Sequence, residues 1–252
     1  MVFRRMFGRP ARIAGRPPSG NGASSFHLHW QLPPSAPLIG VQATFEVVHP
    51  PQVENLYFWA LQASFGDGRR TEGGAHLGLQ WNSRHPGRRA ANWGGYHHSG
   101  RILDGSGSAL PSTPNDPNTR DYAWRPHTPY RFRITRVSDG WRGEIADLTA
   151  GTSVAVRDLY SPGTELVAPM VWSEVFAPCE APQVAVRWSA FGALTVDRQV
   201  VVPGALRVNY QAYEAGGCSN TNVLADGDGV VQVTNTERTV PQGTVTADFT
   251  SM

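Results

Sequence analysis

Short stretches of alternating apolar and polar residues recur along the chain from residue 26 almost to its end. In the clearest of them, residues 130–137, apolar side chains alternate with arginines, which is the pattern of a half-buried β-strand. A two-residue turn at Asp139-Gly140 would then set Ile134 opposite Ile145 on a returning strand. No stretch carries the apolar stripe of an amphipathic helix, so the pattern predicts an all-β protein.

The spacing of these stretches indicates the architecture. Turn signals recur every eight to twelve residues, as in sandwiches and barrels, and about a dozen strands suit a two-sheet antiparallel β-sandwich of the jelly-roll type. We expect one domain over residues 26–252 behind a flexible leader, residues 1–25, rich in Arg, Pro and Gly. The rhythm breaks at residues 97–121, a long stretch rich in Gly, Ser, Pro and Asn. The other expected strands are residues 26–32, 38–48, 55–65, 75–81, 141–148, 153–160, 166–176, 183–191, 205–213 and 230–234.

Charge and composition exclude several functions. All 22 basic residues are arginine, which excludes Schiff-base chemistry, a phosphate-binding loop lysine and a lysine general base. Five arginines and no acid lie in residues 1–25, so the remaining 17 arginines face 20 acids and the body is mildly acidic. A nucleic-acid partner is therefore not expected. No apolar run approaches 18 residues, so no transmembrane helix is expected.

The two cysteines, Cys179 and Cys218, each lie among turn residues, which favours a disulfide between two loops over two free thiols. A disulfide suits an oxidising compartment, so we expect a secreted or cell-envelope protein. The beginning of the sequence does not support export in the same way. Arg4-Arg5 is similar to a twin-arginine signal, but no apolar segment follows it.

Several motifs carry a resemblance to known proteins. They are residues 57–62 (YFWALQ) with 74–81 (GAHLGLQW), the hairpin of residues 130–134 and 140–147, and residues 172–176 (WSEVF). Over residues 26 to about 240 the chain resembles an uncharacterised family of bacterial, secreted proteins similar to the concanavalin-like and laminin-G-like jelly rolls. That resemblance transfers no catalytic residue, and it implies an association with polysaccharides.

We therefore predict a non-catalytic domain that binds a polysaccharide or other glycan, without calcium or another cofactor. A polysaccharide lyase or a glycoside hydrolase on the same fold is the first alternative, and a structural or interaction domain of the cell envelope is the second. Outward-facing polar groups, the best single acid and two aromatic residues beside the long loop make up the expected ligand-binding set. Its members are Gln62, His76, Gln80, Trp93, Tyr96, Glu174 and Arg187.

Catalytic and metal sites have weaker support. Acids two residues apart occur only at Asp226 and Asp228, in a turn, and an ion pair between Glu174 and Arg187 is favoured over a catalytic role for Glu174. The pairs His27/His29 and His97-His98 lack an acid at the spacing of known metal motifs, so no metal site is predicted. Oxygen-rich turns could hold calcium, although solvated turns are the favoured interpretation. These turns contain Asn115, Asp116, Asn118 and Asp121, or Asp226 and Asp228.

Overall fold

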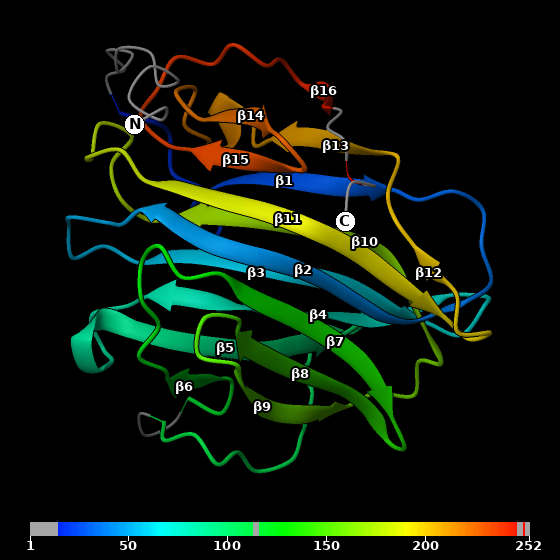
Figure 1. The fold of residues 1–252 in the computed structure, drawn as a ribbon. Helices are drawn as coiled ribbons and strands as arrows, with labels where there is room; N and C mark the ends of the chain where they lie inside the picture. The colour runs from blue at the N-terminus through cyan, green and yellow to red at the C-terminus, as the bar shows by residue number, and fades with distance from the viewer. Residues whose placement is uncertain (1–14, 113–115, 246–248, 250–252) are drawn as a thin grey trace.

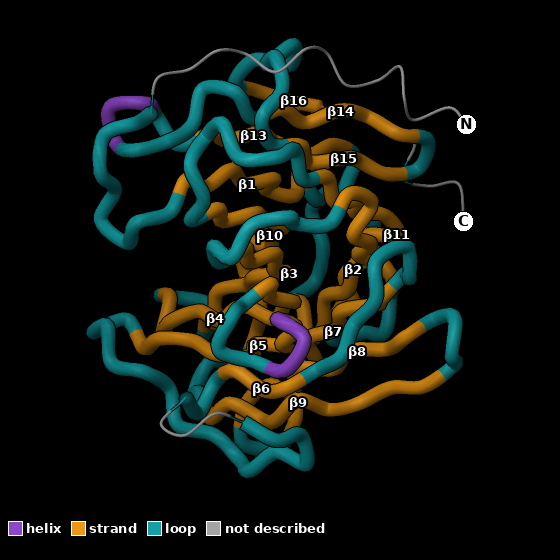
Figure 2. The backbone as a smooth tube through the Cα atoms, turned by 90° about the vertical axis from the view of Figure 1, so that its left-hand side faces the viewer, coloured by secondary structure: helices purple, strands orange, loops and turns teal. Residues whose placement is uncertain are grey.

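The computed structural model describes residues 15–112, 116–245 and 249 of the chain (Figure 1). Within them, sixteen strands pair in antiparallel fashion. They form two layers, seen edge-on in Figure 2, that are joined at one point by the pairing of Leu38 with Leu166. The expected all-β two-sheet sandwich is confirmed.

The first layer, which we name the groove sheet, carries the site described below. In spatial order it consists of β16 (Gly243–Val245), β13 (Ala205–Tyr210), β1 (Ser24–Gln31), β10 (Glu165–Val175), β3 (Tyr57–Gly66), β4 (Thr71–Trp81), β5 (Arg89–His97) and β6 (Thr119–Asp121).

The second layer, which we name the opposite sheet, covers the inner face of the first. Its order is β9 (Thr152–Tyr160), β8 (Gly140–Asp147), β7 (Tyr130–Val137), β2 (Leu38–His49), β11 (Ala185–Thr195), β15 (Gly229–Val233) and β14 (Asn222–Asp226), with the short β12 (Val200–Val201) beside β11.

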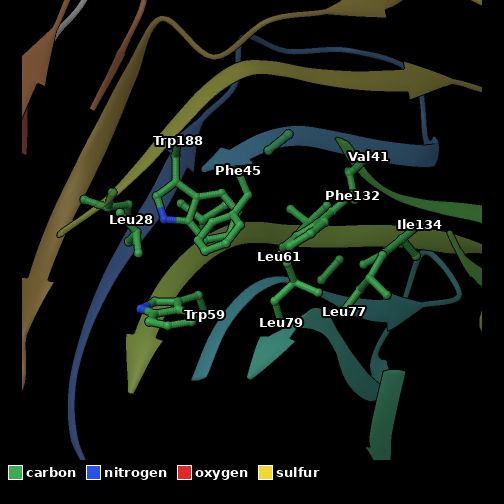
Figure 3. Close-up of a cluster of buried hydrophobic side chains, with 14 of the residues drawn as sticks. Leu28, Val41, Phe45, Trp59, Leu61, Leu77, Leu79, Phe132, Ile134 and Trp188 are labelled. Carbon is green, nitrogen blue, oxygen red and sulfur yellow. The ribbon is translucent and has the colours of Figure 1, made fainter. Parts of the chain in front are cut away.

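Alternate side chains of both sheets point inward and form an aromatic core (Figure 3). Phe45 packs between Trp188 and Phe132, with ring centroids 4.7 Å and 5.2 Å away. Trp59 and Trp141 are also fully buried, as the alternation predicts. Because both layers depend on this core, the outer faces keep their geometry without help from a ligand.

The hairpin between β7 and β8 differs in register from the prediction. Ile134 lies opposite Gly143, two residues from the expected Ile145. The turn is made by Ser138 and Asp139, and Gly140 is already the first residue of β8. A Cβ at position 140 would overlap the carbonyl oxygen of Leu159 on β9, so a close strand approach, rather than the turn, explains this glycine.

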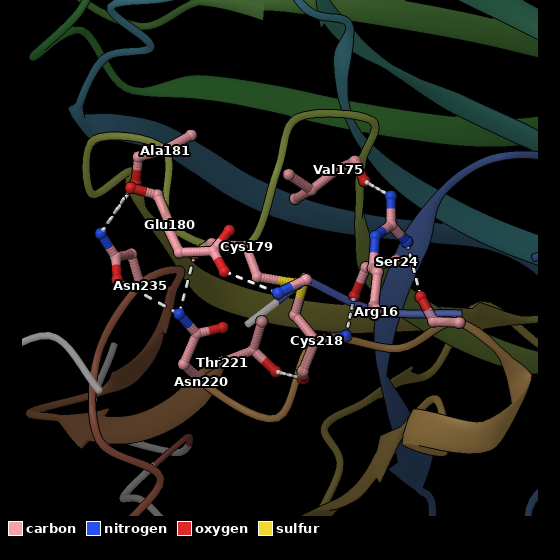
Figure 4. The surroundings of a disulfide bond; sticks show 12 residues. Arg16, Ser24, Val175, Cys179, Glu180, Ala181, Cys218, Asn220, Thr221 and Asn235 are labelled. Carbon is pink, nitrogen blue, oxygen red and sulfur yellow. Dashed lines mark hydrogen bonds between the residues drawn. A yellow bond between two sulfur atoms is a disulfide. The ribbon is translucent and has the colours of Figure 1, made fainter. Parts of the chain in front are cut away.

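Cys179 and Cys218 form the expected disulfide, which joins the loop after β10 to the loop before β14 (Figure 4). Arg16 extends along this region and donates hydrogen bonds to the carbonyl oxygens of Gly216 at 2.6 Å and Val175 at 3.3 Å. The backbone N–H of Gly15 donates to Glu180 at 2.8 Å, so the chain is attached to the domain from residue 15, ahead of β1. The rest of the expected leader, residues 1–14, lies outside the described residues, and the domain boundary at residue 25 stays a prediction.

None of the described residues belongs to a helix long and apolar enough to cross a membrane.

Candidate functional site

An open groove of about 620 Å³ crosses the outer face of the groove sheet. Strand alternation explains it, because the even-numbered residues of β3 from Phe58 to Ser64 and of β10 from Met170 to Glu174 point away from the core. The groove is lined by Asn21, His27, Phe58, Gln62, Ser64, Thr71, Gly73, Gly74, Ala75, His76, Tyr96, His97, Trp172 and Glu174.

Aromatic rings form the floor of the groove. The ring of Phe58 stands edge-on to Trp172 with centroids 4.9 Å apart, and His76 packs on both, at 5.3 Å from Phe58 and 5.7 Å from Trp172. This enclosure lowers the pKa of His76 to about 4, because burial penalises the charged ring. His76 is therefore neutral at physiological pH, and the floor is an uncharged aromatic surface.

Gln62 is held in one orientation at one side of this floor. It lies opposite His76 on β4 and opposite Met170 on β10. Its Oε1 accepts a hydrogen bond of 2.8 Å from the indole Nε1 of Trp172. The acceptor of the amide is thereby engaged, and its N–H groups remain as the donors that Gln62 can offer to a ligand.

Glu174 lies at the other side of the floor, half-buried, opposite Phe58 on β3 and Ser25 on β1. Its Oε1 accepts a hydrogen bond of 3.2 Å from the side-chain amide of Asn21. Burial raises the pKa of Glu174, and the Asn21 hydrogen bond opposes that rise only in part. In the described part of the chain, no arginine or histidine forms an ion pair with this carboxyl.

His27 of β1 lies directly opposite Trp172 of β10 and lines the groove together with Glu174. Burial, together with the nearby His29, lowers the pKa of His27 to about 4, so this ring is also neutral near pH 7. A neutral imidazole carries one N–H donor and one acceptor nitrogen. The end of the groove at Glu174 thus combines a carboxyl of raised pKa, an amide and an uncharged imidazole.

Gln62 and Glu174 lie at different levels of the groove. Gln62 is level with Met170, four residues along β10 from Glu174, which corresponds to roughly 13 Å at about 3.3 Å per residue. Trp172 occupies the level between them. The two groups therefore bracket the aromatic floor and would contact different parts of one ligand.

Four of the residues expected to bind a ligand share this groove: Gln62, His76, Tyr96 and Glu174. Tyr96 is exposed, as expected, with 49% of its surface accessible. Their common location supports the grouping, and their role in binding stays a prediction.

The expected exposure of Trp93 is wrong, because this side chain is fully buried. It is the direct cross-strand partner of Leu77 on the core face, and its Nε1 donates to the carbonyl oxygen of Trp141 at 3.3 Å. Gln80 is also removed from the groove, since it is buried and its Oε1 accepts a hydrogen bond from Asn82.

Arg187 lies on β11 in the opposite sheet, so the expected ion pair with Glu174 is wrong. Its guanidinium instead binds Asp226, at 2.9 Å, and Asp228. β10 and β11 follow one another in the sequence but belong to different sheets, which places the two residues on opposite outer faces.

The turns considered for calcium use their carboxylates within the protein. Asp116 accepts two backbone hydrogen bonds and faces Arg84 at 3.8 Å, and Asp121 binds His85 at 2.7 Å. Asn115 lies outside the described residues. The second turn, with Asp226 and Asp228, is the partner of Arg187 described above.

Sequence reasoning missed three groups of the site. Asn21 falls in the expected leader, His27 was considered only as a metal ligand, and Trp172 had no assigned direction. It also missed that Glu72 comes next to the His97-His98 pair. The histidine pair is visible in the sequence, but its acidic neighbour becomes apparent only when β4 and β5 are paired in register.

Comparison with known proteins identifies solved structures of similar fold. No protein-family description matches the chain, and no curated protein matches its sequence. A crystal structure of scytalido-glutamic peptidase with a peptide-based transition-state analogue matches with a TM-score of 0.50 at 12% identity, over 83% of this chain and 97% of that chain. SCP-B, a member of the eqolisin family of peptidases in complex with the tripeptide Ala-Ile-His, matches over the same shares at 12% identity with a TM-score of 0.45.

At this identity the first likeness concerns the fold alone: the chain has the β-sandwich architecture of a glutamic peptidase. The two-sheet sandwich implied by the sequence resemblance agrees with this fold. The finer assignment to concanavalin-like proteins stays a prediction.

Proposed function

We propose that the chain is a hydrolase that cleaves peptide bonds in the groove, with Glu174 as the catalytic acid and base. The observation that carries this proposal is the environment of Glu174, which is a half-buried carboxyl of raised pKa without a cationic partner among the described residues. A half-buried carboxyl whose pKa is raised and that no ion pair holds among the described residues is suited to proton transfer. The architecture shared with a glutamic peptidase supports the same chemistry.

The residues that line the groove disfavour a glycoside hydrolase, which is one of the alternative functions. These enzymes ordinarily use two carboxyl groups, one on each side of the scissile bond. Among the described residues that line the groove, Glu174 is the single carboxyl. Hydrolysis by one carboxyl and a water molecule fits this inventory better.

The proposed reaction has two proton transfers through Glu174. The ionised carboxylate takes a proton from a water molecule while the water oxygen forms a bond to the carbonyl carbon of the peptide, and the carbonyl π electrons move to its oxygen. The N–H of neutral His27, which lines the same groove, would donate to that oxyanion. The protonated Glu174 then donates its proton to the amide nitrogen, the C–N bond breaks, and an acid and an amine leave.

An extended peptide suits the shape of the groove. Glu174 is level with Phe58, and the far end at Gly73 is level with Phe65, seven residues further along β3, or roughly 23 Å at about 3.3 Å per residue. The aromatic floor would contact apolar side chains, and the donors of Gln62 would hold a backbone carbonyl. A disulfide-bonded peptidase is suited to an exported location.

Digestion of a diverse peptide library by the full chain, followed by mass spectrometry, tests the proposal. We expect new termini with the wild type over a range from acidic to neutral pH, and none with Glu174→Gln. Glu165→Gln is the matched control, because Glu165 is on the same strand but does not line the groove. Cleavage that persists in Glu174→Gln would exclude Glu174 as the acid and base.

Binding without cleavage is the second candidate, and it retains the glycan-binding prediction. The aromatic floor favours it, since a sugar ring or an apolar side chain can stack on Trp172 and Phe58. A glycan that binds the wild type but not Trp172→Ala, together with an intact peptide library, would establish this function in place of hydrolysis.

A further inference from the structure

A cluster of metal-ligating groups lies at the end of the groove away from Glu174. Glu72 of β4 and His97 and His98 at the end of β5 each present one ligand atom, and these three atoms lie within 4.8 Å of one another. Glu72 is 5% exposed, whereas the side chains of His97 and His98 are 24% and 55% accessible. The cluster thus has a buried carboxylate at its base and an accessible side.

We infer that this cluster binds a divalent metal ion of the zinc class. The Oε2 atom of Glu72 is 3.9 Å from Nε2 of His97 and 3.9 Å from Nδ1 of His98. Metal–ligand bonds of about 2.0–2.1 Å in tetrahedral geometry set ligand atoms roughly 3.3 Å apart. A closure of about 0.6 Å between the ligand atoms therefore brings the carboxylate into coordination with either ring. Two imidazoles and one carboxylate form a typical zinc ligand set with one position left for water.

The surroundings hold the ligands in this arrangement. The backbone N–H of His98 donates to the carbonyl oxygen of Glu72 at 2.8 Å, which fixes the two strands at the cluster. The Nδ1 atom of His97 is 3.1 Å from the hydroxyl and 3.4 Å from the backbone nitrogen of Ser99, which hold the ring with its Nε2 on the side of Glu72. Such outer contacts commonly orient metal-binding histidines.

The positive charge of Arg70 does not block the site. Its Nε donates to Oε1 of Glu72, whereas both histidine nitrogens are paired with Oε2, and the Arg70 side chain is 72% accessible. Arg70 thus positions the carboxylate and leaves Oε2 to the metal. The site is also distinct from the proposed hydrolytic centre, since Gly73, beside Glu72, is roughly 23 Å along the sheet from the level of Glu174 at about 3.3 Å per residue.

Isothermal titration of the untagged, chelator-treated full chain with zinc chloride tests the inference. We expect one strong site and a rise in melting temperature on addition of zinc, because an ion that binds only the folded state stabilises it. His98→Ala should weaken zinc binding by more than the roughly 10–100-fold that loss of an outer contact costs, and Glu72→Gln should weaken it as well. His98 is accessible, so its replacement leaves the fold intact, which circular dichroism checks.

His29→Gln is the matched control, because His27 and His29 form another imidazole pair on the same sheet, with ring centroids 6.1 Å apart. Unchanged affinity in this variant, with loss in His98→Ala, supports the site. Unchanged affinity in His98→Ala, or loss of binding in His29→Gln, would overturn it. The titration contains no peptide, so its outcome is independent of the proposed hydrolysis.

Discussion

The two outer faces of the sandwich treat charged groups in different ways. On the opposite sheet, Arg187 binds two aspartates of the β14–β15 hairpin, and Arg142 binds Asp158 at 2.8 Å. On the groove sheet, Glu174 receives a single hydrogen bond from the described residues, which comes from the neutral amide of Asn21. Ion pairs on the opposite sheet hold strands together, whereas no described residue supplies Glu174 with a compensating charge.

The pKa directions follow from this difference. The hydrogen bond and charge of Asp158 raise the pKa of Arg142, which favours the charged guanidinium. Burial raises the pKa of Glu174, which makes its charged form less stable and its proton easier to retain. A carboxyl that is costly to ionise suits proton transfer, and a paired carboxylate suits structure.

The largest effect we expect separates the two faces by activity. Glu174→Gln should lower peptide hydrolysis by roughly 10²–10⁴-fold, the usual contribution of a general acid or base. Asp226→Asn, an equivalent change of one acid on the opposite face, should leave the rate unchanged. Initial rates on one peptide from the library measure both, and a similar loss in the two variants would abolish the distinction.

The next largest effect concerns a buried side chain that forms hydrogen bonds with strands of both layers. Gln232 of β15 accepts hydrogen bonds from Ser173 and Trp188 and donates to the carbonyl oxygen of Phe26, all within the buried core. Gln232→Leu leaves these groups without partners and should lower the free energy of unfolding by about 2–4 kcal/mol. Urea denaturation measures it, with the exposed Gln199→Leu as the control that should change little.

A smaller loss of stability should follow removal of the ion pairs on the opposite face. Arg187→Ala leaves Asp226 and Asp228 facing one another without their cation and should cost about 1–2 kcal/mol, since the group is 23% accessible and partly screened. Peptide cleavage should be unaffected. Thermal denaturation tests the first expectation, and a marked fall in cleavage rate would show that this face contributes to the site.

The smallest expected effect is a pH dependence of the free energy of unfolding. Its sign is opposite to that of a carboxylate whose pKa is lowered by folding. Because the pKa of Glu174 is higher in the folded chain than its ordinary value of 4.5, the folded state holds the proton longer, and the free energy of unfolding falls as pH rises above that value. Glu174→Gln should therefore be more stable than the wild type near neutral pH and should lose this advantage in acid. Denaturation curves of the wild type and Glu174→Gln, recorded near neutral pH and in acid, check this expectation. A stability advantage of the variant that does not depend on pH would contradict it.

Local patterns were sufficient to predict the fold class. Alternation along residues 130–137 and 55–65 identifies β7 and β3 directly, because a strand with one buried face repeats every two residues. The same alternation directs Gln62 and Glu174 outward, and the turn settings of the cysteines indicate the disulfide.

Long-range pairing explains what the sequence did not reveal. Arg187 seemed a neighbour of Glu174 because their strands are consecutive, yet the chain crosses between sheets at that point. Trp93 is buried because its cross-strand partner is Leu77, which no local signal shows. Glu72 meets His98 in the same way, through a register that emerges only when the sheet is assembled.

The central claim is that Glu174 performs hydrolysis in the groove. Its most direct test is incubation of one cleaved peptide with the wild type and with Glu174→Gln in ¹⁸O-labelled water, followed by mass spectrometry of the products. We predict one ¹⁸O atom in the new carboxyl terminus with the wild type and no product with the variant. Labelled product at equal rates from both proteins, or an intact peptide library with the wild type, would contradict the claim.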